Sequence, residues 1–373
     1  MNIDISFAQK CIEENEIWLD SIRGSLIGGA AGDALGFPVE FLSSSEISDI
    51  YPDPGISDYH LDENSGRALI SDDTQMTLFT ANGLLYRATR LMTKGIAYDL
   101  EHYVWLAYKE WLGTQTGKFP EKKICWISDI AELRASRGPG TTCLTALSGG
   151  VMGTIEEPVN ISKGCGGIMR VAPVALYTGR QRKYDGAKTA AITHGHPLGY
   201  MSAEALSQIL HRVVFGKDSE EKHLSDIIAE SGNEMYELFN GTEFLMYLLE
   251  IMDLAQKLAL NDDDDKRNIS RIGEGWVAEE ALGIAIYCSL RYYNDFSKAI
   301  IAAVNHEGDS DSTGAITGNI VGAHVGYSNI PLKWKTHLEL HDTILEIADD
   351  LCHDCQISDK SSYRDKAWEN KYL

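Results

Sequence analysis

Two segments of the chain place a glycine at every fourth residue. Residues 24, 28, 32 and 36 are glycine in the first segment, and residues 314, 318, 322 and 326 are glycine in the second. On an α-helix, residues four apart lie on one face, so each segment would carry a stripe of glycines. An interior glycine costs about 1 kcal/mol of helix propensity relative to alanine, and the usual compensation is the close approach of another backbone. We therefore expect two helices at the centre of a bundle, where they can pack on each other.

The same spacing of small residues is common in membrane helices, but here it is interrupted. Asp33 and its polar neighbours break the apolar run, and no other run approaches the roughly 20 apolar residues that span a bilayer. Residues 1–20 have no basic start and no apolar centre, so we see no secretory signal. The seven cysteines are scattered, which argues against a disulfide framework. We therefore expect a cytoplasmic protein without membrane contact.

The other apolar patterns also predict helices. Residues 203–215, 242–260 and 279–304 carry apolar residues at helical spacing, whereas alternating segments typical of strands are nearly absent. A chain of 373 residues suits one large domain or two ordinary ones. The sequence therefore predicts an all-α fold with long loops.

Composition also predicts the boundaries of the domain along the chain. Residues 1–21 read as an N-terminal extension, and residues 22–359 as one all-α domain. Within that domain, residues 216–270 are rich in charge and indicate a peripheral helical insertion, whose acidic run at 262–265 is typical of a solvated loop. Residues 360–373 form a polar tail, for which we expect partial order at most.

The charge balance excludes several kinds of partner. The chain has 55 acidic and 33 basic residues, which gives a formal charge of −22. Such a chain repels a phosphate backbone and an anionic membrane surface, so we expect no nucleic acid among its partners. The same charge favours bound divalent cations wherever carboxylates cluster.

Two motifs offer such clusters. Residues 71–74 read Ser-Asp-Asp-Thr before an apolar helical pattern, and residues 309–313 read Asp-Ser-Asp-Ser-Thr before the second glycine stripe. Each motif alone fits a helix N-cap. Four carboxylates brought together would repel one another unless cations lay between them, and oxygen ligands suit Mg²⁺ or Mn²⁺ better than zinc. A two-metal site is therefore plausible, and Glu40 would add a fifth carboxylate.

Two further motifs are less specific. Residues 164–170 (GCGGIMR) form a glycine-rich loop, whose backbone N–H groups suit phosphate but which also fits an ordinary turn. His194 and His196 lack the additional ligands that zinc needs. For His194, a buried structural role and a contact with substrate remain equally open.

Taken together, these motifs resemble one family. In order, the chain carries GDALG followed by Glu40, SDDT from residue 71, RGPGTTC from residue 137, GCGGIMRVAPVAL from residue 164, THGHP from residue 193, GEGWVAEEAL from residue 273 and NHEGDSDSTGAITGNIVGA from residue 305. This series resembles the ADP-ribosylglycohydrolase family, of the dinitrogenase-reductase-activating glycohydrolase type. The resemblance runs from about residue 22 to about residue 335.

The resemblance implies a compact orthogonal helical bundle with a binuclear Mg²⁺ or Mn²⁺ centre in a cleft. By position, the residues that it implies as metal ligands are Ser71, Asp72, Asp73, Asp309, Asp311 and Ser312. Ser71 and Ser312 stand where relatives often have threonine, and both keep the hydroxyl. Asp73, Asp311 and Glu40 are the candidates for proton transfer, and the sequence does not choose among them.

The resemblance also implies a set of residues that line the cleft and contact ADP-ribose. These are Gly138, Gly140, Thr141, Gly164, Cys165, Gly166, Gly167, Met169, His194, Gly275 and Trp276. Cys165 departs from the small polar residue common at its position, so the resemblance implies a role for the backbone donors of this loop and not for its side chain.

The activity that the resemblance implies is removal of ADP-ribose from a modified acceptor, by cleavage at the anomeric carbon of ribose. Arginine on a protein is the favoured acceptor, with serine-linked or O-acetyl-ADP-ribose as alternatives. The enzyme would then reverse the action of an ADP-ribosyltransferase or give immunity to a transferase toxin. Two other readings stay open: a module that binds ADP-ribose or blocks a toxin without turnover, and a two-metal phosphodiesterase that releases AMP. We expect a monomer.

Overall fold

The computed structural model describes residues 5–178, 183–216, 222–360 and 362–373, and for residues 5–14 it describes the backbone alone. Over this part of the chain, 17 α-helices and five short 3₁₀-helices form, with three isolated β-bridges and no strand. The all-α fold predicted from the apolar spacing is therefore confirmed.

The helices follow one another in this order. The first nine α-helices are α1 (Ile5–Gly36), α2 (Ser44–Ile50), α3 (Asp72–Lys94), α4 (Leu100–Thr116), α5 (Thr141–Ser148), α6 (Ala172–Leu176), α7 (Asp185–Ala191), α8 (Pro197–Phe215) and α9 (Leu224–Phe239). The others are α10 (Leu245–Ala259), α11 (Asp265–Ile272), α12 (Ala278–Arg291), α13 (Phe296–Val304), α14 (Ser310–Val325), α15 (Leu332–Lys335), α16 (His341–His353) and α17 (Lys366–Tyr372). The 3₁₀-helices are η1 (Phe37–Val39), η2 (Trp126–Asp129), η3 (Glu132–Arg134), η4 (Cys165–Gly167) and η5 (Tyr327–Asn329).

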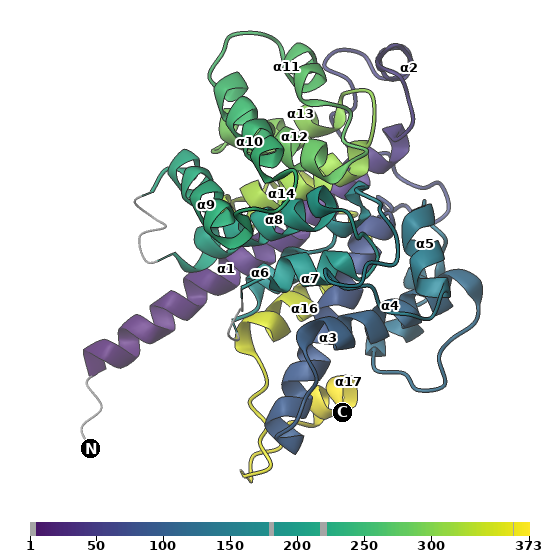
Figure 1. The fold of residues 1–373 in the computed structure, drawn as a ribbon, viewed down its shortest axis with the longest axis vertical. Coiled ribbons are helices and arrows are strands. Elements are labelled where there is room, and N and C mark those ends of the chain that lie inside the picture. The colour runs from purple at the N-terminus through teal and green to yellow at the C-terminus, as the bar shows by residue number, and fades with distance from the viewer. Residues whose placement is uncertain (1–4, 179–182, 217–221, 361) are drawn as a thin grey trace.

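At the centre of the molecule, α1 and α14 pack on each other along their glycine stripes (Figure 1). A Cβ atom added at Gly28 would lie 2.3 Å from the carbonyl oxygen of Gly318, and one added at Gly318 would lie 2.0 Å from that of Gly28. The contact repeats in antiparallel order for Gly24 with Gly322, Gly32 with Gly314 and Gly36 with Ser310. Only glycine allows this approach, so the expected packing of the two striped helices is confirmed.

Two buried polar side chains fix the register of this helix pair. The Asn319 side-chain amide donates to the carbonyl oxygen of Ser25 at 2.8 Å, and the Ser25 hydroxyl donates to that of Asn319 at 3.0 Å. Because a buried polar group is costly unless it is paired, sliding one helix along the other would break both bonds. The pair therefore has one preferred alignment.

Other helices surround this central pair. α8, α12 and α13 pack against α14, and α16 packs against α1. α3 packs against α4 and α16, and it also contacts α1 and α14. As a result, the first turns of α3 and α14 both lie near the last turn of α1.

Residues 279–304, expected as one helical segment, form α12 and α13 instead. Tyr292 leaves the helical conformation, with φ −127° and ψ 34°. Asp295 then caps α13, because its side chain accepts a hydrogen bond from the amide of Lys298 at 3.1 Å. By accepting from a free amide at the start of α13, Asp295 favours the start of a separate helix over the continuation of α12.

The expectation of a poorly ordered tail was wrong for the described residues after 361. They include α17, in which Trp368 and Tyr372 are buried. The Trp368 indole donates to the Thr89 hydroxyl at 2.8 Å, and the Tyr372 hydroxyl donates to Asp350 at 2.7 Å. Burial of two large aromatic side chains with paired polar atoms outweighs the polar composition of the segment.

The charge-rich segment 216–270 contains α9, α10 and the start of α11, and its residues 217–221 lie outside the described part of the chain. Its acidic run is more than a solvated loop. Asp264 caps α11, and Asp265 accepts hydrogen bonds from the hydroxyls of Tyr287 and Tyr292. The segment is therefore tied to α12 and to the residue that follows it.

Two sequence expectations concern membranes and disulfides. In the described part of the chain, no helix combines the length and the apolar character needed to cross a membrane. The six cysteines whose side chains the structure describes are all free thiols, as expected. Cys11 lies among the residues described by their backbone alone.

The helix contact predicts opposite effects for two glycine-to-alanine substitutions. Gly28→Ala forces a methyl group into the backbone of α14, so we expect a loss of about 3 kcal/mol or more in the free energy of unfolding. Gly232→Ala in α9 is the control, because its Cβ would meet only Leu249 Cδ2 at 3.8 Å. We expect it to stabilise the protein by up to about 1 kcal/mol through helix propensity. Urea denaturation of both variants measures the two effects, and a Gly28→Ala variant as stable as the wild type would contradict the close contact.

Candidate functional site

The first turn of α3 carries one of the two acidic motifs. Ser71 is the N-cap, and its hydroxyl accepts a hydrogen bond from the amide of Asp73 at 3.2 Å. Asp72 and Asp73 occupy the first turn and are buried. A serine cap and acidic first-turn residues are what the free amides and the positive end of a helix favour. Local sequence therefore accounts for the start of α3, but not for the burial of its two carboxylates.

The first turn of α14 carries the other acidic motif. Asp309 is the N-cap and accepts from the amide of Ser312 at 3.2 Å, while Asp311 accepts from the same amide at 2.9 Å. Asp309, Asp311 and Ser312 are all buried. Ser310 touches Gly36 at the end of α1, so the glycine contact determines where these carboxylates lie.

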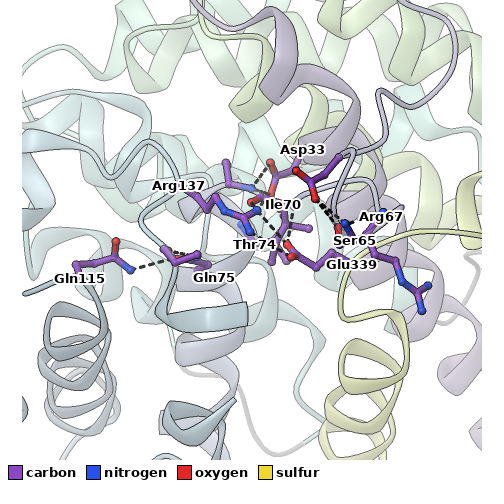
Figure 2. Close-up of polar contacts among 12 residues, drawn as sticks. Asp33, Ser65, Arg67, Ile70, Thr74, Gln75, Gln115, Arg137 and Glu339 are labelled. Carbon is purple, nitrogen blue, oxygen red and sulfur yellow. Dashed lines mark hydrogen bonds and ion pairs between the residues drawn. The ribbon is translucent and has the colours of Figure 1, made fainter. Parts of the chain in front are cut away.

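Asp33 holds the α3 motif in place from α1, and the sequence analysis did not identify it as a site residue. It lies on α1, is fully buried, and accepts from the amide of Ser71 at 3.0 Å and from the amide of Thr74 at 3.1 Å. The Thr74 hydroxyl also donates to it at 2.5 Å (Figure 2). The available signal was a carboxylate within an otherwise apolar, glycine-striped helix, which indicates a buried polar contact.

An ion pair holds the residue before the α3 cap from the other side. Glu339 accepts from the amide of Ile70 at 3.2 Å, and Arg137 donates to both oxygens of Glu339 at 3.3 Å. Arg137 also donates to the carbonyl oxygen of Ile70 at 3.4 Å, and its own carbonyl accepts from the amide of Asp72 at 2.9 Å. Figure 2 shows Asp33, Arg137 and Glu339 converging on this short segment. Three distant parts of the chain therefore fix the start of α3.

The carboxylates of this cluster destabilise one another's charged forms. Burial, together with the charges of Asp311, Asp309 and Asp72, raises the pKa of Glu40 to about 10. Burial raises the pKa of Asp72 to about 8, with Asp33 and Asp309 adding to the shift. Burial and the neighbouring carboxylates raise the pKa of Asp311 to about 7. Desolvation and like charge both favour the protonated acid, so the cluster lacks compensating positive charge.

Asp73 and Asp309 show the same effect, because burial followed by the charge of Asp311 raises the pKa of each carboxyl well above its usual range. The Oδ2 atom of Asp73 is buried and has no hydrogen-bond partner. Among the described residues, no group of three or more His, Cys, Asp or Glu side chains is already arranged to hold a metal ion. An unpaired buried oxygen among mutually repelling carboxylates is nevertheless suited to a hard cation, because such a cation removes both costs.

The glycine-rich loop lies beside the α14 cluster. The Cys165 thiol donates to Asp309 at 2.7 Å, and burial with the charge of Asp309 raises the pKa of that thiol well above its usual range. The Cys165 amide donates to the carbonyl oxygen of Trp276 at 3.2 Å, and Gly164 forms a β-bridge with Val277. The loop at 164–167 and the segment before α12 are therefore joined next to Asp309.

The loop before α5 borders the α3 cluster. The amide of Gly140 donates to Asp72 at 3.3 Å. Gly138 has a φ of +69°, and a Cβ atom there would lie 3.6 Å from Glu40 Oε2. Thr141 is exposed at the first residue of α5. Gly138 and Gly140 are thus brought to the carboxylates, with Thr141 next in the chain.

The segment before α12 contributes Gly275 and Trp276. A Cβ atom at Gly275 would lie 3.4 Å from Asp309 Cβ. The Trp276 ring stacks on Phe41 with ring centroids 5.2 Å apart, and Phe41, directly after Glu40, is 70% exposed. The sequence analysis did not identify Phe41, because nothing in its local pattern distinguishes it from an ordinary surface residue.

Met169 and His194 are both buried. The Met169 sulfur lies 3.9 Å from the Ser312 hydroxyl. The His194 ring lies against the glycine loop, because Cβ atoms added at Gly164 and Gly166 would lie 3.5 Å and 3.2 Å from its Nε2 atom. Both residues are thus placed beside elements of the predicted site.

Comparison with known proteins identifies the same family that the motifs suggested. The ADP-ribosylglycohydrolase family model matches residues 14–360. The chain is similar to ADP-ribosylhydrolase ARH3 of Homo sapiens, at 24% identity over 86% of this chain and 90% of the relative. It is similar to ADP-ribosyl-(dinitrogen reductase) glycohydrolase of Rhodospirillum rubrum, at 25% identity over 86% of this chain and 91% of the relative. It is also similar to ADP-ribosylarginine hydrolase Tri1 of Serratia proteamaculans, at 28% identity over 91% of this chain and 81% of the relative.

A solved structure supports the fold. A chain of an ADP-ribosylglycohydrolase-related protein complex superposes with a TM-score of 0.63 and 20% sequence identity. The match covers 91% of this chain and 99% of the other. At this identity, the similarity establishes the shared fold.

The carboxylate cluster predicts how stability depends on pH in the absence of cations. In the unfolded chain, carboxyl groups are ionised above about pH 4. In the folded protein, Asp72 keeps its proton up to its pKa of about 8, and Glu40 up to its pKa of about 10. The folded protein then binds more protons than the unfolded chain, so stability is lost as pH rises toward those values. Buried histidines whose pKa is lowered oppose this trend only weakly above pH 7, because an unfolded imidazole, with a pKa near 6.5, is already mostly neutral there.

We therefore expect the free energy of unfolding in EDTA to fall between pH 7 and pH 8. Asp72→Asn should make this slope shallower by up to about 1 kcal/mol per pH unit. Urea denaturation at the two pH values measures it, with Asp253→Asn, which changes an exposed carboxylate of α10, as the control. Equal slopes in the wild type and Asp72→Asn would mean that Asp72 is already ionised in the folded protein.

Proposed function

The chain belongs to the ADP-ribosylglycohydrolase family, and we propose that it cleaves ADP-ribose from mono-ADP-ribosylated arginine on protein. The observation that supports this most directly is the convergence of two helix N-termini, each with two buried aspartates, next to a glycine-rich loop. Such an arrangement offers ligands for cations on one side and backbone donors for a diphosphate on the other.

We propose two Mg²⁺ or Mn²⁺ ions as cofactors. The residues that would hold them are Ser71, Asp72, Asp73, Asp309, Asp311 and Ser312. When bound, such ions orient ribose hydroxyls and lower the pKa of a water molecule, which supplies the nucleophile at neutral pH. The unpartnered oxygen of Asp73 and the raised pKa values of the cluster support this assignment.

The residues of the chain supply binding and proton transfer. The loop at 164–167 and His194 would hold the diphosphate, and Gly138, Gly140, Thr141, Met169, Gly275 and Trp276 would line the rest of the cleft. Among Asp73, Asp311 and Glu40, we propose Glu40 as the group that protonates the leaving nitrogen, because it is the one that is not fully buried.

The choice of arginine as acceptor rests on chemistry and on one relative. A guanidinium group suits a chain with a net charge of −22, and Phe41 offers an exposed ring directly after Glu40. The relative from Serratia proteamaculans is named for ADP-ribosylarginine. The partner would then be an ADP-ribosylated protein, and the setting either reversal of an endogenous transferase or immunity to a transferase toxin.

We expect metal-dependent release of intact ADP-ribose from an arginine-modified protein. The substrate is incubated with the wild-type chain plus Mg²⁺ or Mn²⁺, with EDTA, and with Asp73→Asn or Asp311→Asn, and the product is identified by mass. Each of these substitutions should lower kcat because it removes a proposed metal ligand, whereas Glu40→Gln should lower kcat by about 10²–10⁴-fold, the range typical for loss of a positioned proton donor. Asp253→Asn serves as the control, because it lies in α10, outside the cluster.

Different failures of this experiment separate the alternatives. Release from serine-linked or O-acetyl substrates alone would correct the acceptor and keep the hydrolase. Release of AMP would identify a phosphodiesterase instead. Binding of ADP-ribose with no release from any substrate would leave a binding module, and full activity in EDTA would contradict the proposed cofactors.

A further inference from the structure

Arg170, in the glycine-rich motif, is a fully buried cation with unusual partners. Its Nη1 donates to the sulfurs of Met76 and Cys143, each at 3.2 Å, and its Nη2 donates to the Thr193 hydroxyl at 2.6 Å. Its guanidinium lies over the Tyr108 ring at 4.3 Å, and its Nε has no partner. Within the described residues, no carboxylate pairs with it. A buried charge without an opposite charge beside it is costly unless another group or a ligand compensates it.

The contacts of Arg170 set the direction of a chain of hydrogen bonds. A guanidinium only donates, so the Thr193 oxygen accepts from Arg170 and has one hydrogen of its own left to donate. The Nδ1 atom of His194 lies 2.8 Å from that oxygen. Among the described residues, the Cys143 sulfur is the other acceptor near this hydroxyl, and it is much weaker than an imidazole nitrogen. If Thr193 donates to the stronger acceptor, Nδ1, the ring proton of a neutral His194 lies on Nε2.

The Nε2 atom of His194 faces the glycine-rich loop. Only 1% of this residue is exposed, and Cβ atoms added at Gly164 and Gly166 would lie 3.5 Å and 3.2 Å from Nε2. Nε2 itself has no hydrogen-bond partner among the described residues. Burial and the charge of Arg170 lower the pKa of His194 to about 3, so the ring is neutral at physiological pH. A ring nitrogen without a hydrogen-bond partner among the described residues thus faces the loop.

We infer that Arg170 and Thr193 are positioning residues that hold His194 in the Nε2–H form, so that its N–H donates to a phosphate oxygen of bound ADP-ribose. This inference rests on the proposed function for the ligand. In the opposite tautomer, Nε2 would present a lone pair to the phosphate and repel it. The positive charge of Arg170, unpaired by any described carboxylate, is a nearby counter-charge for the same anion.

The tautomer is measured directly on the wild-type chain. Nitrogen-15 NMR of protein labelled at histidine distinguishes a protonated from an unprotonated ring nitrogen, and a His194→Gln sample identifies the His194 signals by their loss. We expect a protonated Nε2 and an unprotonated Nδ1 at pH 7. A protonated Nδ1, or a doubly protonated ring, would overturn the inference without any variant having to fold.

Two pairs of variants then test the consequence for binding, with ADP-ribose affinity measured by calorimetry and folding by thermal denaturation. Thr193→Val removes the hydroxyl and should lower the affinity for ADP-ribose about tenfold, the usual cost of one hydrogen bond to a charged group. Thr193→Ser keeps the hydroxyl and should restore most of that affinity. The amide of His194→Asn reaches only the position of Nδ1, whereas the amide of His194→Gln reaches that of Nε2. We therefore expect His194→Asn to lower the affinity for ADP-ribose more than His194→Gln does. Equal affinities within either pair would overturn the inference.

The outcomes keep this inference separate from the proposed function. A wild-type chain that binds no ADP-ribose would refute the proposed function, and with it the phosphate contact described here. A chain that binds and hydrolyses as proposed, but whose His194 carries its proton on Nδ1, would refute this inference alone.

Discussion

The backbone contact between α1 and α14 is the constraint on which the rest of the molecule depends. Because glycine faces glycine in antiparallel order, the last turn of α1 lies beside the first turn of α14. Asp33 and Glu40, near that end of α1, therefore lie close enough to Asp311 for their charges to affect one another. A larger side chain anywhere in the stripe would push α14 away together with its carboxylates. The glycines cost helix propensity, but they allow the close backbone contact that sets the distance between the two halves of the site.

The third helix of the site is fixed by longer-range contacts. Asp33 accepts from the first turn of α3, while Glu339 and Arg137 hold the residue before its cap. The N-terminal ends of α3 and α14 both face the cluster, so the helix dipoles partly offset the negative charge of the aspartates. Burial, followed by the charges of Asp33 and Asp309, still raises the pKa of Asp72. Rigid backbone contacts therefore keep together carboxylates that would otherwise separate.

Periodicity and composition were enough to predict the all-α fold, and the glycine spacing predicted its central contact. Both acidic motifs were found because each combines a cap with extra carboxylates, and the structure places them together, although their roles stay predictions. Asp33 was missed as a site residue because its partners lie far away in the sequence. A carboxylate in an apolar helix indicates a buried polar contact, but it does not identify the residues that make it. The order of the tail was misjudged, since burial of Trp368 and Tyr372 depends on what packs against them. Helix caps and glycine spacing could be predicted from local sequence, whereas contacts between residues far apart in the sequence could not.

The two sides of the site carry opposite electrostatic imbalances. On one side, buried aspartates lack positive charge; on the other, Arg170 lacks a carboxylate partner among the described residues. The two could have neutralised each other if the fold had placed them in contact, yet Arg170 contacts sulfurs, a hydroxyl and an aromatic ring instead. Under the proposed function, cations would compensate the aspartates, and the diphosphate of ADP-ribose would bind on the side of Arg170. The substrate would then be held as an anion at one end and would react beside cations at the other.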